Sequence, residues 1–263
     1  MKLNERQLYV KVRNLVMFLM STAVACGVVI NHSGTQTYPS NVGANSTINI
    51  PSGSATFEGT INSGTVVNQS GGGSIFNGNI KNNVVFNLSG GLMEVNSIQN
   101  NAQINQSGGT LLLNQPIGNG ASVNVSGGSL DLGADGIFAN NTNITLSGGL
   151  LATNGFGFNV DSLTLSGNST IDLGGNEDIQ IDLGAVSGSG TVTFTNWGSG
   201  NVINYDSLNL GEGGDIIFDG VGSVIGGGTI IPPVPEPKAY VMGAALLLLI
   251  GFHRYRRLRS SVE

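Results

Sequence analysis

The feature that most constrains the fold is a short repeat of about nineteen residues. From Ser52 to Ser187, the serines that mark successive copies are 18, 19, 18, 19, 21, 19 and 21 residues apart. A unit of this length has no room for a helical crossover and cannot bury an apolar face by itself, so the units must stack. Five copies carry the full Ser-Gly-Gly marker, and weaker copies begin at Ser52, Ser166 and Ser187. The full markers begin at Ser70, Ser89, Ser107, Ser126 and Ser147.

A second marker runs in phase with the first. Pairs of Asn-Asn or Asn-Gly begin seven residues before the next marker serine, at Asn82, Asn100, Asn119 and Asn140, and Ser63-Gly64 keeps the same offset. Asn and Gly tolerate positive φ, so both markers predict turns. About five residues remain between them, which is enough for one strand.

Apolar and polar residues alternate in that strand. Three residues before the marker serine stand Val67, Phe86, Ile104, Val123, Ile144 and Leu163. Two residues before it stand Asn68, Asn87, Asn105, Asn124, Thr145 and Thr164. Alternation with a period of two predicts that the first column faces a core, and that the second faces solvent or forms a stacked amide ladder.

The glycines of each marker precede a second alternating segment. Its inward pairs are Met93 and Val95, Leu111 and Leu113, and Leu130 and Leu132, around Glu94, Leu112 and Asp131. A shorter third strand is expected near Ile80, Ile98 and Ile117. No stripe with a period of 3.6 residues occurs between residues 40 and 230, so the pattern does not indicate helices there.

We therefore predict an all-β protein, a parallel β-helix or solenoid of about eight coils of roughly 19 residues, stacked about 4.8 Å apart. A β-sandwich or meander is the alternative, although neither requires turns at one recurring offset. The expected organisation is a signal peptide (1–25), an N-terminal cap or linker (26–44), the repeats (45–220), a linker (221–234) and a tail (235–259). Beyond Ser187 the rhythm loosens, so Trp197 is expected in an irregular cap more than in an aromatic ligand platform.

Charge excludes several functions. Residues 32–231 contain thirteen acidic residues and one basic residue, Lys81, a net of −12. Such a surface repels phosphate backbones, so nucleic-acid binding is excluded. The two histidines, His32 and His253, flank this body and the single Cys26 precedes it. A Ser-His-Asp or Cys-His arrangement, or a zinc site of His and Cys, is not expected within it.

The first thirty residues have the layout of a signal peptide and the start of a mature chain. Cations precede an apolar run from Leu15 to about Ala25, which ends in the small residues Ala23 and Ala25. Signal peptidase is therefore expected to cleave after Ala25, so that the mature chain begins at Cys26. A small residue before Cys-Gly also resembles a lipobox, in which Cys26 would be lipidated. A third reading places Cys26 inside the hydrophobic segment. The cations are Lys2, Arg6, Lys11 and Arg13.

The tail combines three features in order. They are Pro235-Glu236-Pro237, an apolar stretch from Ala239 to Phe252, and an arginine cluster. As a helix, fourteen residues rise about 21 Å, short of the ~30 Å hydrocarbon core, so they predict a thin or tilted span. The cluster is expected on the cytoplasmic side of the membrane. Its residues are Arg254, Arg256, Arg257 and Arg259.

This tail resembles the PEP-CTERM sorting signal, from which Lys238 departs because a small residue is usual there. The resemblance implies recognition by an exosortase-type membrane protease, removal of the helix, and transfer to or release from the surface of a Gram-negative, polysaccharide-producing bacterium. A permanent membrane anchor is the alternative. The body is similar to the Gly-, Asn- and Ser-rich passenger repeats of autotransporter-type surface proteins, through segments such as Leu146 to Leu150 and Ser107 to Leu113.

These observations predict a non-enzymatic, exported surface or extracellular-matrix protein in a biofilm or exopolysaccharide context. Its expected partners are signal peptidase and the exosortase-type protease during export, the inner membrane transiently, and an exopolysaccharide. An adhesin or glycan-binding module that uses the Asn column as a polar strip is the alternative. No cofactor is expected, and no metal either, because the glycine-rich acidic segments lack the spacing of calcium-binding repeats.

A polysaccharide-acting enzyme is the most remote hypothesis. It would need two carboxyl groups that face one cleft. The default for the body's carboxylates is instead a solvated acidic face. The candidates are Asp172, Glu177, Asp178, Asp182, Asp215 and Asp219.

Overall fold

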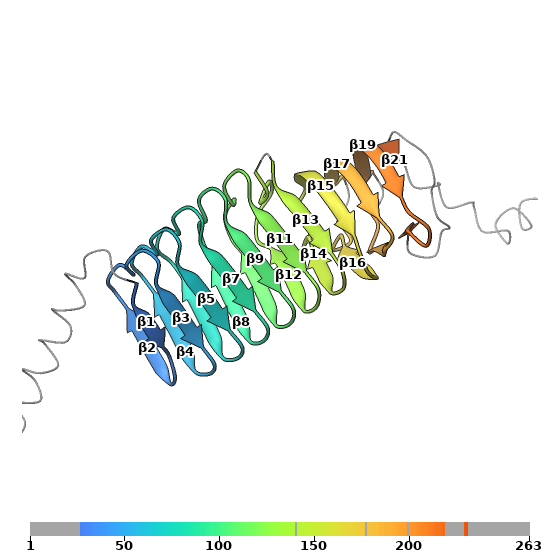
Figure 1. Cartoon of the computed structure of the whole chain (residues 1–263). Coiled ribbons are helices and arrows are strands. Elements are labelled where there is room, and N and C mark those ends of the chain that lie inside the picture. Colours follow the sequence, from blue (N-terminus) through green and yellow to red (C-terminus); the bar gives the residue numbers. More distant parts are fainter. Residues whose placement is uncertain (1–26, 140, 177, 199, 219–228, 231–263) are drawn as a thin grey trace, which may run out of the picture. The chain divides into compact units, whose positions relative to one another are not determined.

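The computed structural model describes residues 27–139, 141–176, 178–198, 200–218 and 229–230. These residues form an all-β parallel solenoid of about nine turns, and none of them is helical (Figure 1). The predicted all-β parallel solenoid is confirmed, with about nine turns where about eight were expected. A sandwich or meander would need antiparallel neighbours, whereas only one strand pair of the described residues is antiparallel. No described segment is a helix capable of crossing a membrane.

Successive strands alternate between two sheets. In sequence order, sheet A contains β1 (Val29–Asn31), β3 (Thr47–Ile50), β5 (Val66–Gln69), β7 (Val85–Leu88), β9 (Gln103–Gln106), β11 (Ser122–Val125), β13 (Asn143–Leu146), β15 (Phe158–Leu165), β17 (Gln180–Gly188), β19 (Val202–Leu210) and β21 (Thr229–Ile230). Sheet B contains β2 (Thr35–Tyr38), β4 (Ser54–Phe57), β6 (Gly73–Phe76), β8 (Leu92–Val95), β10 (Thr110–Leu113), β12 (Ser129–Leu132), β14 (Leu150–Ala152), β16 (Ser169–Asp172), β18 (Thr191–Thr195) and β20 (Asp215–Phe218). Each strand therefore hydrogen-bonds to the strands one coil before and after it.

A third line of pairing lies where a shorter third strand was expected, but it does not form a strand. It consists of isolated parallel β-bridges, one residue per coil, so it is a row of contacts and not a sheet. Its side chains are buried and close the third side of the interior. The row comprises Val42, Ile61, Ile80, Ile98, Ile117 and Phe138.

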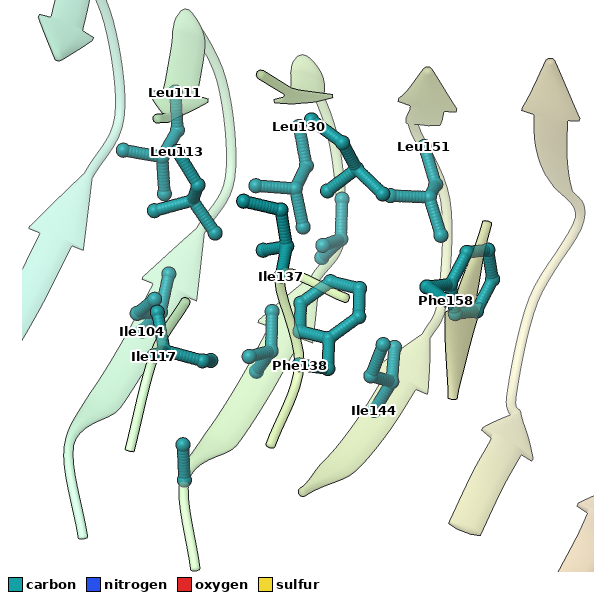
Figure 2. Packing of buried hydrophobic residues seen from close by; sticks show 14 of the residues in the cluster. Ile104, Leu111, Leu113, Ile117, Leu130, Ile137, Phe138, Ile144, Leu151 and Phe158 are labelled. Atoms are coloured by element: carbon teal, nitrogen blue, oxygen red, sulfur yellow. The ribbon is translucent and has the colours of Figure 1, made fainter. Parts of the chain in front are cut away.

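The core is one continuous stack of inward side chains. Both predicted apolar columns are buried, as the alternation required. In Figure 2, Leu111 and Leu113 of β10 face Ile104 of β9 and Ile117 of the third row across the interior. Equivalent positions in successive coils stack on one another. The rings of Phe57 and Phe76, for example, are stacked with their centroids 4.7 Å apart. Stacking therefore supplies the burial that a single coil lacks.

The two sequence markers form two kinds of corner. The Ser-Gly-Gly marker is the corner between a sheet A strand and the next sheet B strand, and its second glycine has positive φ in all five full copies. At Gly109, φ is 70° and a Cβ would lie 2.5 Å from the carbonyl oxygen of Gly91 in the preceding coil. This position therefore requires glycine for both conformation and space. The Asn marker enters sheet A, with positive φ at Asn83, Asn101 and Asn141 and at Gly64 and Gly120.

The solenoid begins before the first marker. The segment expected as a cap or linker (26–44) contains β1 and β2, which pair in parallel with β3 and β4. Within the expected linker (221–234), β21 pairs antiparallel to β19. The expected signal peptide and the tail from residue 235 lie outside the described residues, as does most of that linker.

The coils also continue beyond Ser187, where an irregular cap was expected. Ser162 pairs with Ala185, and Ala185 with Ser207, so these turns take 23 and 22 residues. In the coils before them, pairing residues from Thr47 to Asn143 are 18 to 21 positions apart. We call residues 27–156 the regular coils and residues 157–218 the extended coils.

In the extended coils, one long sheet A strand replaces the Asn corner. The strands β15, β17 and β19 have eight, nine and nine residues. In β15 two successive residues, Asp161 and Ser162, are not buried and interrupt the alternation, as do Gly184 and Ala185 in β17. In β19 no residue from Asp206 to Leu210 is buried. The chain bends there without a residue of positive φ.

Trp197 belongs to the packing of the extended coils. Its ring meets Phe218 edge to face at a centroid distance of 4.9 Å and Phe194 at 6.4 Å. Its Nε1 is buried without a hydrogen-bond partner among the described residues. The side chain is therefore a partly buried component of the core, and not an exposed platform for a ligand.

Candidate functional site

A ladder of asparagine amides runs along the outer face of sheet A. Six residues occupy the same register position in successive coils, and the Nδ2 of every residue after the first donates a hydrogen bond of 2.8 to 2.9 Å to the Oδ1 of the residue in the coil before. The stacked amide column predicted from sequence is confirmed, and the structure adds Asn31 and Asn49 to it. The ladder consists of Asn31, Asn49, Asn68, Asn87, Asn105 and Asn124.

Strand register explains why the ladder forms. Parallel strands one coil apart are separated by about 4.8 Å, so identical outward side chains stack directly above one another. In β9, Ile104 and Gln106 point inward on either side of Asn105 and fix its outward direction. In the next two rungs Thr145 and Thr164 occupy the position, and the amide ladder ends at Asn124.

A groove of about 640 Å³ follows this ladder. We call it the ladder groove. One side is formed by the ladder residues, and the other by Pro51 and by serines of the Ser-Gly-Gly corners. Between them lie residues such as Leu88, whose side chains are buried in the core. No residue that lines the groove is charged or aromatic. The corner serines are Ser70, Ser89, Ser107 and Ser126.

Two buried glutamines lie in the strands beneath the groove, and sequence reasoning did not identify them. Gln69 and Gln106 take inward positions that are otherwise apolar, and each is only 1% exposed. The Gln69 Nε2 donates to the carbonyl oxygen of Leu92 at 2.8 Å, and its Oε1 accepts from the hydroxyl of Ser74. The Gln106 Nε2 donates to the carbonyl oxygen of Ser129 at 2.7 Å, but the Gln106 Oε1 has no partner among the described residues.

The serine explains the difference between the two glutamines. Ser74 lies five residues after Gln69 and supplies the hydroxyl that its Oε1 needs. Leu111 stands five residues after Gln106 and offers no donor. A glutamine five residues before a serine was the signal in the sequence that could have revealed the satisfied pair.

A second, shorter amide ladder lies at the corners that follow sheet B, and it too was missed. The Nδ2 of Asn96 donates to Oδ1 of Asn77 at 2.7 Å, and the Nδ2 of Asn114 donates to Oδ1 of Asn96 at 2.9 Å. Glutamates meet both ends, because Asn77 donates to Glu58 and Asn114 to Glu94. The recurrence of these asparagines at 19 and 18 residues was the available signal.

A second groove, of about 520 Å³, lies at the bend of the extended coils. It is lined by three carboxylates, Asp161, Asp182 and Asp206. The Asp182 Oδ1 accepts a hydrogen bond of 2.7 Å from Asn204, and Gln180 donates to both of its oxygens. Among the described residues, no three His, Cys, Asp or Glu side chains are grouped as a metal site requires. We call this the bend groove.

The structure distributes the other candidate carboxylates over different sheets. Asp172 and Asp215 belong to sheet B, whereas Asp182 belongs to sheet A. The Asp172 Oδ1 accepts hydrogen bonds from the Gly174 N–H at 2.8 Å and from Asn196 at 2.7 Å. Asp178 has positive φ. Glu177 and Asp219 lie outside the described side chains.

Tyr38 and His32 lie together in the first coil. Burial raises the pKa of the Tyr38 phenol above its ordinary value. The Tyr38 hydroxyl lies 3.0 Å from Nδ1 of His32, and the ring stacks on Phe57 at a centroid distance of 4.7 Å. These contacts complete the interior at the first coil, so both residues have a structural role there.

The residues expected to direct export lie outside the described part of the chain. Their roles therefore stay predictions. They are the cleavage residues Ala23 and Ala25, the lipidation candidate Cys26, and the sorting residues Pro235, Glu236, Pro237, Arg254, Arg256, Arg257 and Arg259.

Comparison of the chain with protein-family models, with curated proteins and with solved structures gave no significant match. Function is therefore inferred from the residues and their geometry. The ladder groove is the stronger candidate site, because its lining repeats over six coils and because its amides keep hydrogen-bonding capacity that the ladder does not use.

Proposed function

We propose that this protein is a non-enzymatic component of a Gram-negative cell surface or extracellular matrix, exported and processed at both ends. Its tail, which resembles the PEP-CTERM signal, would be recognised by an exosortase-type protease while the apolar segment is in the inner membrane. The solenoid would then be displayed or released in a biofilm or exopolysaccharide setting. The observation that carries the proposal is the ordered tail of Pro-Glu-Pro, apolar stretch and arginines behind a body with a net charge of −12.

Physical properties of the tail support temporary retention of the precursor in the inner membrane. The two prolines limit backward extension of a helix, because proline lacks the N–H that a helix interior requires. The apolar stretch is short for a bilayer, and the arginines favour the cytoplasmic side. Residues 32–231 have one basic residue, so little opposes their translocation.

The described body supports a structural role. Along the regular coils, its outward amides pair with one another from coil to coil. A surface that satisfies its own polar groups along the stack axis is suited to a stiff scaffold. The repeated corners keep that surface uniform over many coils.

Mass spectrometry of intact protein and peptides from the cell surface tests the proposal. Wild-type surface protein should begin at Cys26 or nearby and lack residues 239–263. Glu236→Ala should leave full-length precursor in the membrane fraction, as should replacement of the four tail arginines by glutamine. Lys238→Ala should be processed like the wild type, because it restores the small residue usual in the signal. Peptides from 258–263 in released wild-type protein would instead establish a permanent anchor.

A glycan-binding module is the second candidate, and one observation favours it. The ladder groove is an uncharged depression that follows the amide ladder. A scaffold needs no such depression, whereas a binding module does. The two roles are compatible, since a matrix protein can hold a polymer.

A further inference from the structure

We infer that the ladder groove binds one chain of an extended, uncharged, β-1,4-linked glycan that runs along the stack axis. The inference rests on the proposed function in one respect only, which is that a surface or matrix protein would encounter such a glycan. Its physical basis is the groove itself, which spans six coils from Asn31 to Asn124.

Hydrogen-bonding capacity is the first argument. An asparagine amide has two N–H donors and two acceptor lone pairs. Each inner rung, such as Asn87, uses one N–H toward Asn68 and one lone pair toward Asn105. The second donor and the second lone pair of every inner rung are left for solvent or a ligand. A hydroxyl is both donor and acceptor, so it matches this pair of groups.

The spacing of these groups is the second argument. The rungs repeat about every 4.8 Å along a straight line, because they follow the stacking of parallel strands. Serine hydroxyls repeat at the same interval on the other side of the groove. An extended polymer presents hydroxyls at regular intervals along both edges, so it can meet both rows. A coiled polymer leaves a straight groove after a few sugars.

Charge decides between classes of polymer. The lining carries no charged side chain, and eleven of the thirteen acidic residues in 32–231 lie beyond it in the sequence, at positions 131–219. The groove therefore offers no cation to pair with a polyanion such as a uronate polymer, while the net negative charge of the whole body opposes its approach. An uncharged glycan is not repelled.

The absence of aromatic rings in the lining predicts how affinity arises. A single sugar gains only a few hydrogen bonds in exchange for those it makes with water, and each contributes little net free energy. A chain that occupies several rungs adds these contacts within one molecule, which raises the effective concentration of each further sugar. Binding should therefore depend steeply on chain length.

Affinity electrophoresis of the full chain in a non-ionic detergent tests the inference. Hydroxyethylcellulose and carboxymethylcellulose share one β-1,4-linked backbone, but only the second is anionic. Hydroxyethylcellulose in the gel should retard the protein and carboxymethylcellulose should not. Cellohexaose should release the protein from hydroxyethylcellulose at a concentration at least about tenfold lower than cellobiose. Equal retardation by both polymers, or equal competition by the two oligosaccharides, would overturn the inference.

A matched pair of variants locates the site. Ser107 is an exposed residue on the rim of the ladder groove, and Ser63 is an exposed residue at an Asn-type corner outside it. Ser107→Arg places a long side chain across the groove and should abolish retardation by hydroxyethylcellulose, whereas Ser63→Arg should leave it unchanged. Both serines are exposed, so both variants should fold, which melting curves will check. Retardation that survives Ser107→Arg in folded protein would place binding elsewhere.

The electrophoresis and the processing experiment fail independently. Protein that is trimmed and displayed at the surface but is not retarded by hydroxyethylcellulose would refute the glycan site and leave the proposed function intact. Retardation of the full chain by hydroxyethylcellulose, alongside wild-type surface protein that keeps residues 239–263, would refute the proposed processing and leave the glycan site intact.

Discussion

The regular and the extended coils build the same two sheets with different corners. In the regular coils, an Asn or Gly of positive φ turns the chain into a short sheet A strand. In the extended coils that corner is missing, and strands of eight or nine residues bend where two successive side chains leave the core. In Figure 1, β15, β17 and β19 follow β13 in the stack, in the yellow to orange part of the chain.

The surface changes with the corner, while the interior does not. The inward column continues without a break from Ile144 through Leu163 to Val186. The outward column changes from a hydrogen-bonded amide ladder to threonines at Thr145 and Thr164. An apolar core thus tolerates a change in coil length, whereas a side-chain ladder requires both constant register and the same residue in every coil.

The largest effect is expected from a charge in the shared core. Ile104→Asp places a carboxylate among apolar side chains and should cost about 4 kcal/mol or more. Trp197, the single tryptophan, reports on the extended coils. If the two regions share one core, the circular dichroism and Trp197 fluorescence transitions should both shift to lower temperature.

Gln103→Asp is the control, because Gln103 is exposed on the same strand. It should melt within a few degrees of the wild type. A normal Trp197 transition in Ile104→Asp, alongside a reduced dichroism transition, would show that the two regions unfold independently.

An intermediate effect is expected at the glycine corners. In Gly109→Ala the new Cβ meets the Gly91 carbonyl oxygen at 2.5 Å and φ is positive, so the substitution should cost about 3 kcal/mol. Gly213 of the extended coils also has positive φ, but a Cβ there meets only the Ser189 oxygen, at 3.8 Å. Gly213→Ala should cost about 1 kcal/mol. Urea unfolding of both variants measures the difference, and equal losses would mean that crowding between coils contributes nothing.

The smallest effect is expected from the ladder. Asn105→Ala removes two hydrogen bonds, to Asn87 and from Asn124, and should cost about 1 to 2 kcal/mol. Thr164 occupies the same column and makes no side-chain hydrogen bond within the described residues, so Thr164→Ala should change stability by less than about 0.5 kcal/mol. Urea unfolding again measures both. A ladder that adds no stability would give the two variants the same midpoint.

Much of the regular region was predictable because each of its features has a local cause. Alternation fixed the inward position of Ile104 and the outward position of Asn105. The conformational freedom of Asn and Gly placed the corners at Asn101 and Gly109. A constant period then required equivalent residues to stack, which predicted the amide ladder before its hydrogen bonds were known.

The remaining features depend on contacts between coils that a single segment does not encode. The bend at Asp161 and Ser162 contains no glycine or asparagine, so nothing in the local sequence marked it. The buried Gln69 is polar, and its hydrogen bonds to Ser74 and Leu92 offset the free-energy cost of burying its amide. The ladder groove is lined by residues of several coils, and the residue pattern of a single coil does not define how they are placed relative to one another.

The amide ladder also bears on covalent modification. Five of its six rungs begin an Asn-x-Ser tripeptide, the acceptor sequence for N-linked glycans, and only Asn49, followed by Ile50 and Pro51, does not. Oligosaccharide transfer needs a free Asn Nδ2 on an accessible loop. In rungs such as Asn87 that nitrogen lies within a paired strand and donates at 2.9 Å to Asn68 of the preceding rung. In the folded solenoid the tripeptides at Asn68, Asn87, Asn105 and Asn124 therefore mark a stacking position and not a glycosylation acceptor.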